Sequence, residues 1–409
     1  MSKTNKALRI SISILCALLL VASLLVVLLP TAGHNVAQAA DLSTRQSRLL
    51  YFLDRNVNGM NSEYDTEASI NSTKTLYDFA GNTYTLVECA PTGYMIMCDD
   101  SATMVEYSGT SPSPYFGLTN NLYYGGPSYF YVLENGTYRH TVTGEIFDYS
   151  PIVSTYSDDD DQSVDYVANA CDEMHNDLVA DANESALNFI ETGIMPRKEI
   201  IGLYGESWTC INNMAFFSSK INSTQIGYKN GGYCGYIAAA MLIGYYDTFI
   251  RDCMDDGWLY MSGTGVNRHF TGYGLVDRLF GFGNGKTSST STTIREAMNA
   301  YFKYYGYKLG SYDMITPFFS GTTLKNLIDK NTPSILFGDL GNATRPNGSS
   351  AEIGPEGGNH AVVVYGYKKG GTGGALYSFL AHYGWSNYSM STINYKSYSV
   401  FGSMYRISL

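Results

Sequence analysis

Residues 230–247 read NGGYCGYIAAAMLIGYYD, so Cys234 stands among glycines and directly before an apolar run. The apolar residues recur at helical spacing, which predicts a helix with Cys234 in its first turn. Backbone N–H groups and the helix dipole favour an anion at that end of a helix, and both lower the pKa of a thiol. The sequence therefore predicts a nucleophilic cysteine; the alternative is a small buried side chain at a helix start.

A thiol nucleophile needs a base, and His360 has a suitable position. It opens the apolar strand in GGNHAVVVYGYKK, after a glycine pair. A histidine at the mouth of a strand can face a cleft, so we expect His360 to accept the thiol proton. Gly358 and Asn359 are expected to border this cleft, while Gly232 and Gly235 let a substrate backbone approach the sulfur. The alternative is a histidine that only packs on its strand.

A third group should orient the imidazole of His360 and fix its tautomer. If residues 361–367 and 376–384 form a hairpin with its turn centred near residue 372, residues 382 to 384 lie opposite His360. This register predicts His382 as the orienting group. Asn387 lies several residues past the register and is the alternative candidate.

The elements that must position these residues follow from periodicity and turn signals. Helices are predicted at 41–56, 163–190 (one long helix or two shorter ones), 234–247, 290–305 and 324–329. Strands joined by tight turns at 80–82, 91–93 and 135–136 are predicted for 76–149, and further strands for 334–340, 361–367, 376–384 and 399–409. The segments 195–230 and 263–291 are predicted to be irregular or surface loops. The pattern favours an α+β protein whose helices cover antiparallel strands.

Composition narrows the class of protein. The 409 residues suggest two folded units, and 44% hydrophobic with 15% charged residues indicates globular cores. A net charge of −11 argues against nucleic acid as a partner. The cysteines lack zinc-type spacing, so we expect no metal and no cofactor. Two arrangements stay open for Cys89 and Cys98, which flank the turn at 91–93: a diagonal contact across a hairpin, or buried thiols.

The N-terminus is typical of a secretory signal peptide. Lys3, Lys6 and Arg9 precede an uncharged apolar run at 10–29, and a small-x-small cleavage pattern ends at Ala39. Cleavage there predicts an extracellular or cell-surface bacterial protein. The run is also about as long as a membrane span, so a retained membrane anchor is the alternative.

The remaining chain divides by composition into three parts. We expect a small β-rich domain at 40–156, a connector at 157–200 that begins with the acidic run SDDDDQ, and a catalytic domain at 201–409. A separate unit before a secreted thiol enzyme suggests an inhibitory propeptide, cut within 195–213; the alternative is a permanent accessory domain.

Several motifs together resemble a known family. They are, in order, TGYMIMCDDSATMVEYSG, GYCGYIAAAMLIGYYD, NTPSILFGDL, GGNHAVVVYGY, YSFLAHYGWSNYS and FGSMYRISL. The last five resemble the papain-like superfamily, most closely the streptopain family of secreted bacterial cysteine peptidases, and the first resembles that family's propeptide. The resemblance implies a papain-like domain after a propeptide, with Cys234 as nucleophile, His360 as general base and Trp385 as the aromatic that shields their hydrogen bonds.

The chain also departs from the family pattern. The usual asparagine before the tryptophan is replaced by His382 and Tyr383, so the third catalytic residue stays open between His382 and Asn387. The nearest glutamine for the oxyanion is Gln225, which lies farther upstream of Cys234 than in the family. We expect a monomer that hydrolyses proteins or peptides; the alternatives are a cell-wall peptide amidase, a transglutaminase-like enzyme, or a degenerate surface adhesion module.

Overall fold

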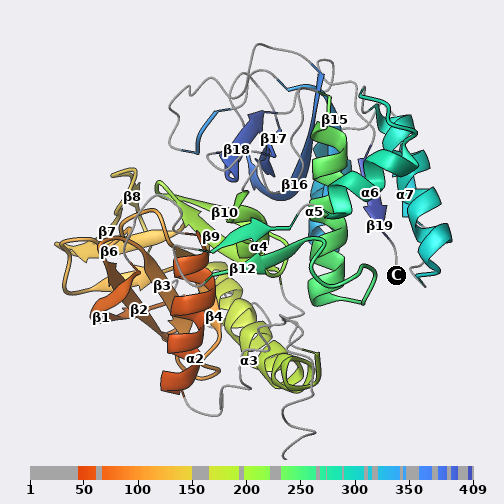
Figure 1. Ribbon diagram of the computed structural model, residues 1–409. Coiled ribbons are helices and arrows are strands. Elements are labelled where there is room, and N and C mark those ends of the chain that lie inside the picture. Colours follow the sequence, from red (N-terminus) through yellow and green to blue (C-terminus); the bar gives the residue numbers. More distant parts are fainter. Residues whose placement is uncertain are drawn as a thin grey trace, which may run out of the picture. The chain divides into compact units, whose positions relative to one another are not determined.

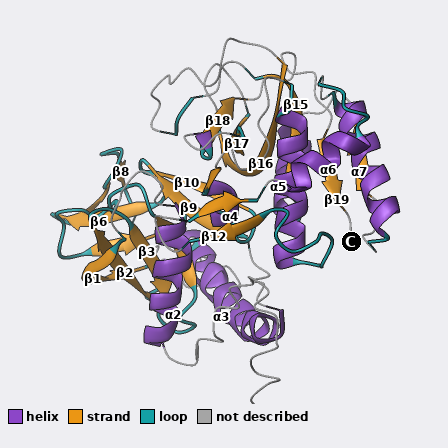
Figure 2. Ribbon diagram, in the orientation of Figure 1, coloured by secondary structure: helices purple, strands orange, loops and turns teal. Residues whose placement is uncertain are grey.

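The computed structural model describes residues 45–60, 67–149, 165–192, 198–221, 232–263, 268–272, 274–287, 290–307, 312–315, 321–340, 344–346, 359–370, 376–384, 388–394 and 404–407. All of them belong to one compact unit, Ala39–Leu409. Helices and a large sheet both contribute to it, which confirms the α+β class (Figures 1 and 2). The predicted signal peptide and the acidic run at 157–162 lie outside the described residues.

The helices are α2 (Arg45–Phe52), which continues as the π-helix η1 (Leu53–Asn58), α3 (Tyr166–Thr192), α4 (Ala215–Ser218), α5 (Cys234–Phe249), α6 (Gly274–Phe282), α7 (Ser291–Tyr305) and α8 (Gly321–Asp329). The five predicted helices are confirmed, and α3 is a single long helix. Local capping explains the limits of α7, because the Thr290 side chain accepts from the Thr293 N–H and Gly306 ends the helix at φ 66°. Among the described helices, none is both long enough and apolar enough to cross a membrane.

The N-terminal strands are β1 (Ser69–Tyr77), β2 (Thr83–Ala90), β3 (Tyr94–Cys98), β4 (Met104–Ser108), β5 (Leu122–Tyr124), β6 (Phe130–Glu134), β7 (Thr137–His140) and β8 (Ile146–Phe147). All three predicted turns join neighbouring strands. Asn135 and Gly136 have φ of 52° and 79°, as a tight hairpin turn requires. Cys89 and Cys98 are free thiols in the cores on opposite faces of this sheet, so they do not meet.

The later strands are β9 (Glu199–Leu203), β10 (Glu206–Cys210), β11 (Lys220–Ile221), β12 (Tyr260–Ser262), β13 (His269–Thr271), β14 (Tyr312–Ile315), β15 (Ser334–Asp339), β16 (Asn359–Lys369), β17 (Tyr377–His382), β18 (Ser391–Asn394) and β19 (Met404–Ile407). The main sheet has the order β14-β19-β15-β16-β10-β9-β4-β3-β2-β1-β5-β6-β7-β8, with β17 and β18 branching from β16. The β9–β10 hairpin therefore joins the N-terminal strands to those that follow α5. The expected boundary at 200 and 201 falls within β9.

Two predicted irregular segments contain regular structure. Residues 195–230 include the β9–β10 hairpin, closed by Tyr204 and Gly205 at φ of 52° and 81°. Residues 263–291 include α6, whose buried side chains are Leu275, Val276 and Leu279. Both predictions were wrong for the same reason. The β9–β10 hairpin is stabilised by pairing with β4 and β16, and α6 by packing on α5 and α7. Local periodicity does not report such long-range contacts.

The core around α5 explains how this helix is held. Its residues from Gly235 to Tyr246 are all buried, and the helix packs on β15 and β16, with α6 and α7 beside it (Figure 1). The Phe217 ring stacks between Tyr245 of α5 and Tyr365 of β16, with centroids 5.1 and 5.6 Å away. Such close-packed aromatic contacts prevent the helix from shifting without disturbing the core.

Candidate active site

Cys234 is the first residue of α5, as predicted, and it is half-buried at the start of an otherwise buried helix. Tyr233, the residue before it, does not cap the helix with its side chain. The helix dipole and the N–H groups of the first turn act directly on the sulfur at this position, and both favour the thiolate. Cys234 thus combines a rigid support with a favourable electrostatic environment.

The chain just before Cys234 is tightly held by the loop after α6. Gly232 has φ 80°, and a Cβ built on it would lie 1.5 Å from the carbonyl oxygen of Thr287. On the following turn, the Tyr236 hydroxyl donates to the Lys286 carbonyl at 3.1 Å. Only glycine fits at position 232, and its role is this close backbone approach.

We expect Gly232→Ala to lower the reaction rate of Cys234 with iodoacetamide by at least roughly tenfold, because the added Cβ must displace the segment that leads into the cysteine. Gly281→Ala is the matched control: it lies in α6 with nothing within 4 Å of a Cβ and without positive φ. Comparing alkylation rates of the two folded variants checks this. Equal rates would mean that the close approach at Gly232 does not position the sulfur.

His360 is near the start of β16, as predicted, and is half-buried opposite Gly338 of β15. Its Nε2 atom donates to the carbonyl oxygen of Tyr383 at 2.8 Å, and the two rings stack with centroids 5.4 Å apart and planes at 24°. Because a carbonyl only accepts, this bond assigns the proton of the neutral ring to Nε2 and leaves Nδ1 as the basic nitrogen. The Tyr383 hydroxyl donates to the Leu340 carbonyl at 3.2 Å, which holds the tyrosine in place.

His382 does not face His360. In the β16–β17 hairpin it pairs with Val363. The pair Lys369 and Tyr377 centres the turn at residue 373, and a bulge between Val364 and Gly366 then shifts the register by one residue, so the predicted register was wrong and His382 lies on the other face from His360. His382 is fully buried; its Nε2 donates to the Ser219 carbonyl at 3.2 Å and its Nδ1 accepts from the Gly384 N–H at 2.9 Å. Burial lowers its pKa to about 3. His382 is therefore a neutral structural residue.

A contact through Gly384 connects the surroundings of Cys234 and His360. A Cβ on Gly384 would lie 3.4 Å from Cγ2 of Ile237, which belongs to the first turn of α5. Gly384 directly follows Tyr383, whose carbonyl and ring hold His360. The segment that orients the imidazole thus packs against the turn that carries the thiol.

The other predicted site residues divide into two groups. Gly235 is buried in the first turn of α5, and Asn359 begins β16 opposite Asp339. The remaining four lie outside the described residues: Gln225, Gly358, Trp385 and Asn387. Sequence reasoning missed Tyr383, because its contribution to the hydrogen bond is a backbone carbonyl, which side-chain type does not reveal.

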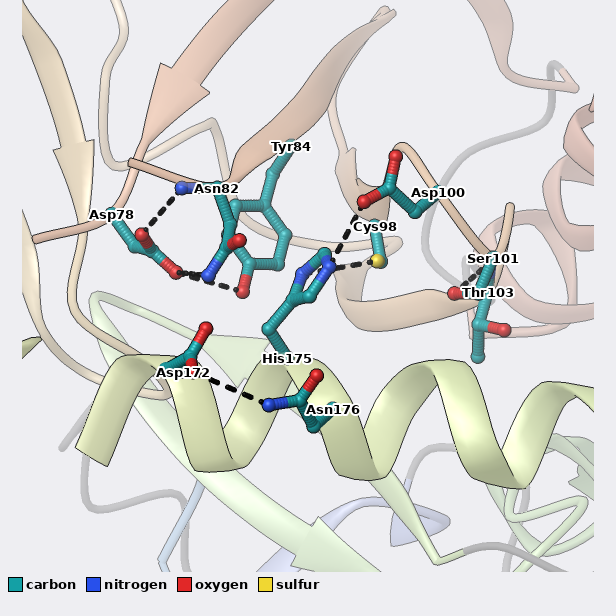
Figure 3. A network of polar contacts seen from close by, with 10 residues as sticks. All are labelled: Asp78, Asn82, Tyr84, Cys98, Asp100, Ser101, Thr103, Asp172, His175 and Asn176. Carbon is teal, nitrogen blue, oxygen red and sulfur yellow. Dashed lines mark hydrogen bonds and ion pairs between the residues drawn. The ribbon is translucent and has the colours of Figure 1, made fainter. Parts of the chain in front are cut away.

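A second cluster combines the same residue types in the N-terminal sheet (Figure 3). His175 of α3 places Nδ1 3.7 Å from Cys98 Sγ and Nε2 3.0 Å from Asp100 Oδ2, with the Tyr84 ring edge-on. Cys98 has no exposed surface and His175 only 6%, so no substrate reaches the sulfur. This cluster fastens α3 to β3. Within the described ranges, no three His, Cys, Asp or Glu side chains form a metal site.

Comparison with known proteins adds no further constraint: no family model matches the chain, and no curated protein matches it significantly.

Proposed function

We propose that this protein is a secreted cysteine endopeptidase with a papain-like catalytic domain, most similar to the streptopain family. The observation that carries the proposal is the hydrogen bond from His360 Nε2 to the Tyr383 carbonyl, beside the helix that begins at Cys234. This bond places the proton of the neutral ring on Nε2 and the lone pair on Nδ1, the tautomer that thiol activation requires of Nδ1. The motif order supports the same assignment.

The mechanism follows from these roles. His360 Nδ1 takes the Cys234 proton, and the thiolate attacks the carbonyl carbon of a peptide. The imidazolium then returns the proton to the leaving amine, and water cleaves the thioester to regenerate the thiol. The Tyr383 carbonyl holds the ring and strengthens its bond when the ring is charged. We assign the oxyanion to the Cys234 N–H and Gln225, at about 3 kcal/mol per donor, and the shielding of the pair to Trp385.

Hydrolysis of denatured casein, blocked by an epoxide that alkylates thiols, tests this function. Labelling of Cys234 by the epoxide without cleavage of casein would redirect the proposal to a cell-wall peptide amidase or a transglutaminase, tested with the corresponding peptides. Absence of both labelling and cleavage would leave an adhesion module.

We further propose that residues 40 to about 197 form an inhibitory propeptide of this exported enzyme. Residues 199–210 are committed to the β9–β10 hairpin, and Lys198 pairs with Asp329 at 2.9 Å. Proteases cut accessible extended segments rather than paired strands. The cut is therefore expected before Lys198, at the N-terminal end of the interval 195–213.

Incubation of the Cys234→Ala precursor with a trace of active enzyme should yield a stable C-terminal fragment whose first residue lies between about 195 and 198. N-terminal sequencing of the fragment identifies the cut. A first residue inside 200–210 would contradict the protection expected from the hairpin. A precursor that stays uncut while the full-length wild type is fully active would instead favour a permanent accessory domain.

A further inference from the structure

The N-terminal strands meet the β9–β10 hairpin through strand pairing, a shared apolar core and several hydrogen bonds. Strand β4 pairs with β9 in parallel at Tyr107 and Ile201. The Tyr107 hydroxyl donates to Glu199 Oε2 at 2.6 Å, and the Ser207 N–H donates to Ser128 Oγ at 2.9 Å. The two sides also share one apolar core, so only the ionisable groups among these contacts can make their strength depend on pH.

Glu106 of β4 lies at this junction and has no exposed surface. Its Oε1 accepts from the hydroxyls of Tyr94 and of Ser207 on β10, each at 2.8 Å, and its Oε2 accepts from the Tyr124 hydroxyl at 3.1 Å. Strand β9 covers the group, since a Cβ on Gly202 would lie 1.7 Å from the Tyr94 hydroxyl. Ser207 is thus the one donor that the hairpin contributes to an otherwise N-terminal cluster.

The groups around Glu106 are neutral. The titratable ones are Tyr94 on β3, Tyr124 on β5 and the nearby Tyr115; burial raises the pKa of each, and so does Glu106. Ser207 on β10 carries no charge, and within the described part of the chain no cationic side chain bonds to Glu106. Glu106 is therefore the group of this cluster that changes charge near neutral pH.

Burial without a counter-charge penalises the carboxylate form. Desolvation raises the pKa of Glu106 to about 7, although the hydroxyls of Ser207, Tyr94 and Tyr124 oppose the shift. When the hairpin separates from β4, water replaces Ser207 and the pKa falls toward the ordinary value of about 4.3. At pH values between these two pKa values, Glu106 takes up a proton when the junction closes. Rising pH therefore favours the open junction.

We propose that the surface between β4 and the β9–β10 hairpin is a pH-dependent latch, in which Glu106 takes up a proton on closing and releases it on opening. The partner held by the hairpin is the N-terminal segment of this same chain. The inference rests on the proposed function, in which that segment is the inhibitory propeptide. The latch is closed most tightly in mildly acidic solution and loosens above neutrality, where the peptidase is released.

Amide hydrogen exchange of full-length Cys234→Ala protein tests the latch without requiring activity. Between about pH 5 and pH 8, with intrinsic exchange rates divided out, the opening constant of β9 should rise by up to roughly 70-fold. Glu106→Gln should remove this dependence. Glu134→Gln, which alters an exposed carboxylate paired with Arg139 on β6–β7, is the matched control and should leave the dependence unchanged.

Ser207→Ala is the second variant, because a buried glutamine amide can prevent folding. Loss of the Ser207 hydroxyl raises the pKa of Glu106 in the closed state further. The opening constant of β9 should therefore continue to rise to higher pH than in the parent protein. A carboxyl ¹³C titration of glutamate-labelled protein, with the Glu106 signal assigned by its absence in Glu106→Gln, should give a midpoint near 7 in the parent. A midpoint near the ordinary value, or equal pH dependence of opening in parent and Glu106→Gln, would overturn the latch.

The catalytically intact chain separates this inference from the proposed function. The onset of casein hydrolysis, normalised to the processed enzyme at each pH, should be faster near pH 8 than near pH 5 and insensitive to pH in Glu106→Gln. A pH-dependent opening of β9 with no hydrolysis at any pH would keep the latch and reject the peptidase. Hydrolysis with an onset that ignores pH in the parent would reject the latch alone.

Discussion

Cys234→Ala should abolish hydrolysis while the protein stays folded. The sulfur is half-buried at the first residue of α5, and the burial of the following turns does not depend on it. Loss of a nucleophile in a triad-type enzyme lowers turnover by at least about 10⁴-fold. Casein cleavage by purified wild type, Cys234→Ala and Cys234→Ser checks the result, with far-UV circular dichroism to confirm folding. Turnover by the alanine variant at the wild-type rate would reject the functional assignment.

The other cysteines supply an internal control when the reactivity of Cys234 is measured by thiol labelling. The structure describes five more free thiols, all buried, and burial raises the pKa of Cys89 to about 12. At mildly acidic pH, where an ordinary thiol of pKa about 8.5 barely reacts, iodoacetamide should label Cys234 ahead of these buried thiols. Peptide mapping of the labelled native protein identifies the site. Equal labelling of Cys234 and Cys89 would show that the start of α5 does not activate the thiol.

His382 should make the folded protein sensitive to acid. Its pKa is depressed to about 3 in the folded state, against about 6.5 in an unfolded chain. The unfolded state therefore binds the proton first as pH falls. Above pH about 6.5, protonation of His382 does not affect the free energy of unfolding. Between that pH and about pH 3 the free energy of unfolding falls by up to about 1.4 kcal/mol per pH unit, which amounts to about 3 kcal/mol by pH 4.

Urea unfolding of wild type and His382→Gln between about pH 4 and pH 7 measures this effect. Glutamine does not titrate but can still donate toward the Ser219 carbonyl. The variant should be less stable at neutral pH and should lose less stability on acidification. It should also keep most of its turnover at pH 7, since the ring nitrogens of His382 bond to Ser219 and Gly384 rather than to His360. Parallel stability curves would contradict the assignment of a buried neutral imidazole.

Local chemistry in the sequence was sufficient to predict several elements correctly. Helix α5 with Cys234 in its first turn follows from apolar spacing, α7 from Thr290 and Gly306 at its ends, and the β6–β7 hairpin from Asn135 and Gly136. Each signal lies within a few residues of the structure it specifies. The position of His360 at the start of β16 follows in the same way.

The orientation of the His360 imidazole was decided by the tertiary structure. The turn is centred at residue 373 rather than 372, and a bulge between Val364 and Gly366 changes the pairing by one residue, which puts His382 opposite Val363; the Tyr383 carbonyl meets His360 instead. Counting residues across a hairpin cannot detect a bulge, because the extra residue depends on how the whole strand packs. Backbone acceptors are present at every position and therefore carry no signal in residue type.

Long-range pairing decided how the chain is organised. Residues 195–230 have weak local signals, yet β9 and β10 are ordered between β4 and β16, which are distant in sequence. The same pairing encloses Glu106 by bringing Ser207 to it, although the two residues are far apart in the chain. The sequence alone was therefore enough for α2, α3, α5, α7 and α8, for the tight turns, and for the positions of Cys234 and His360 at the starts of their elements. The shape of the sheet, the orienting group and the buried carboxyl depend on contacts that exist only in the folded chain.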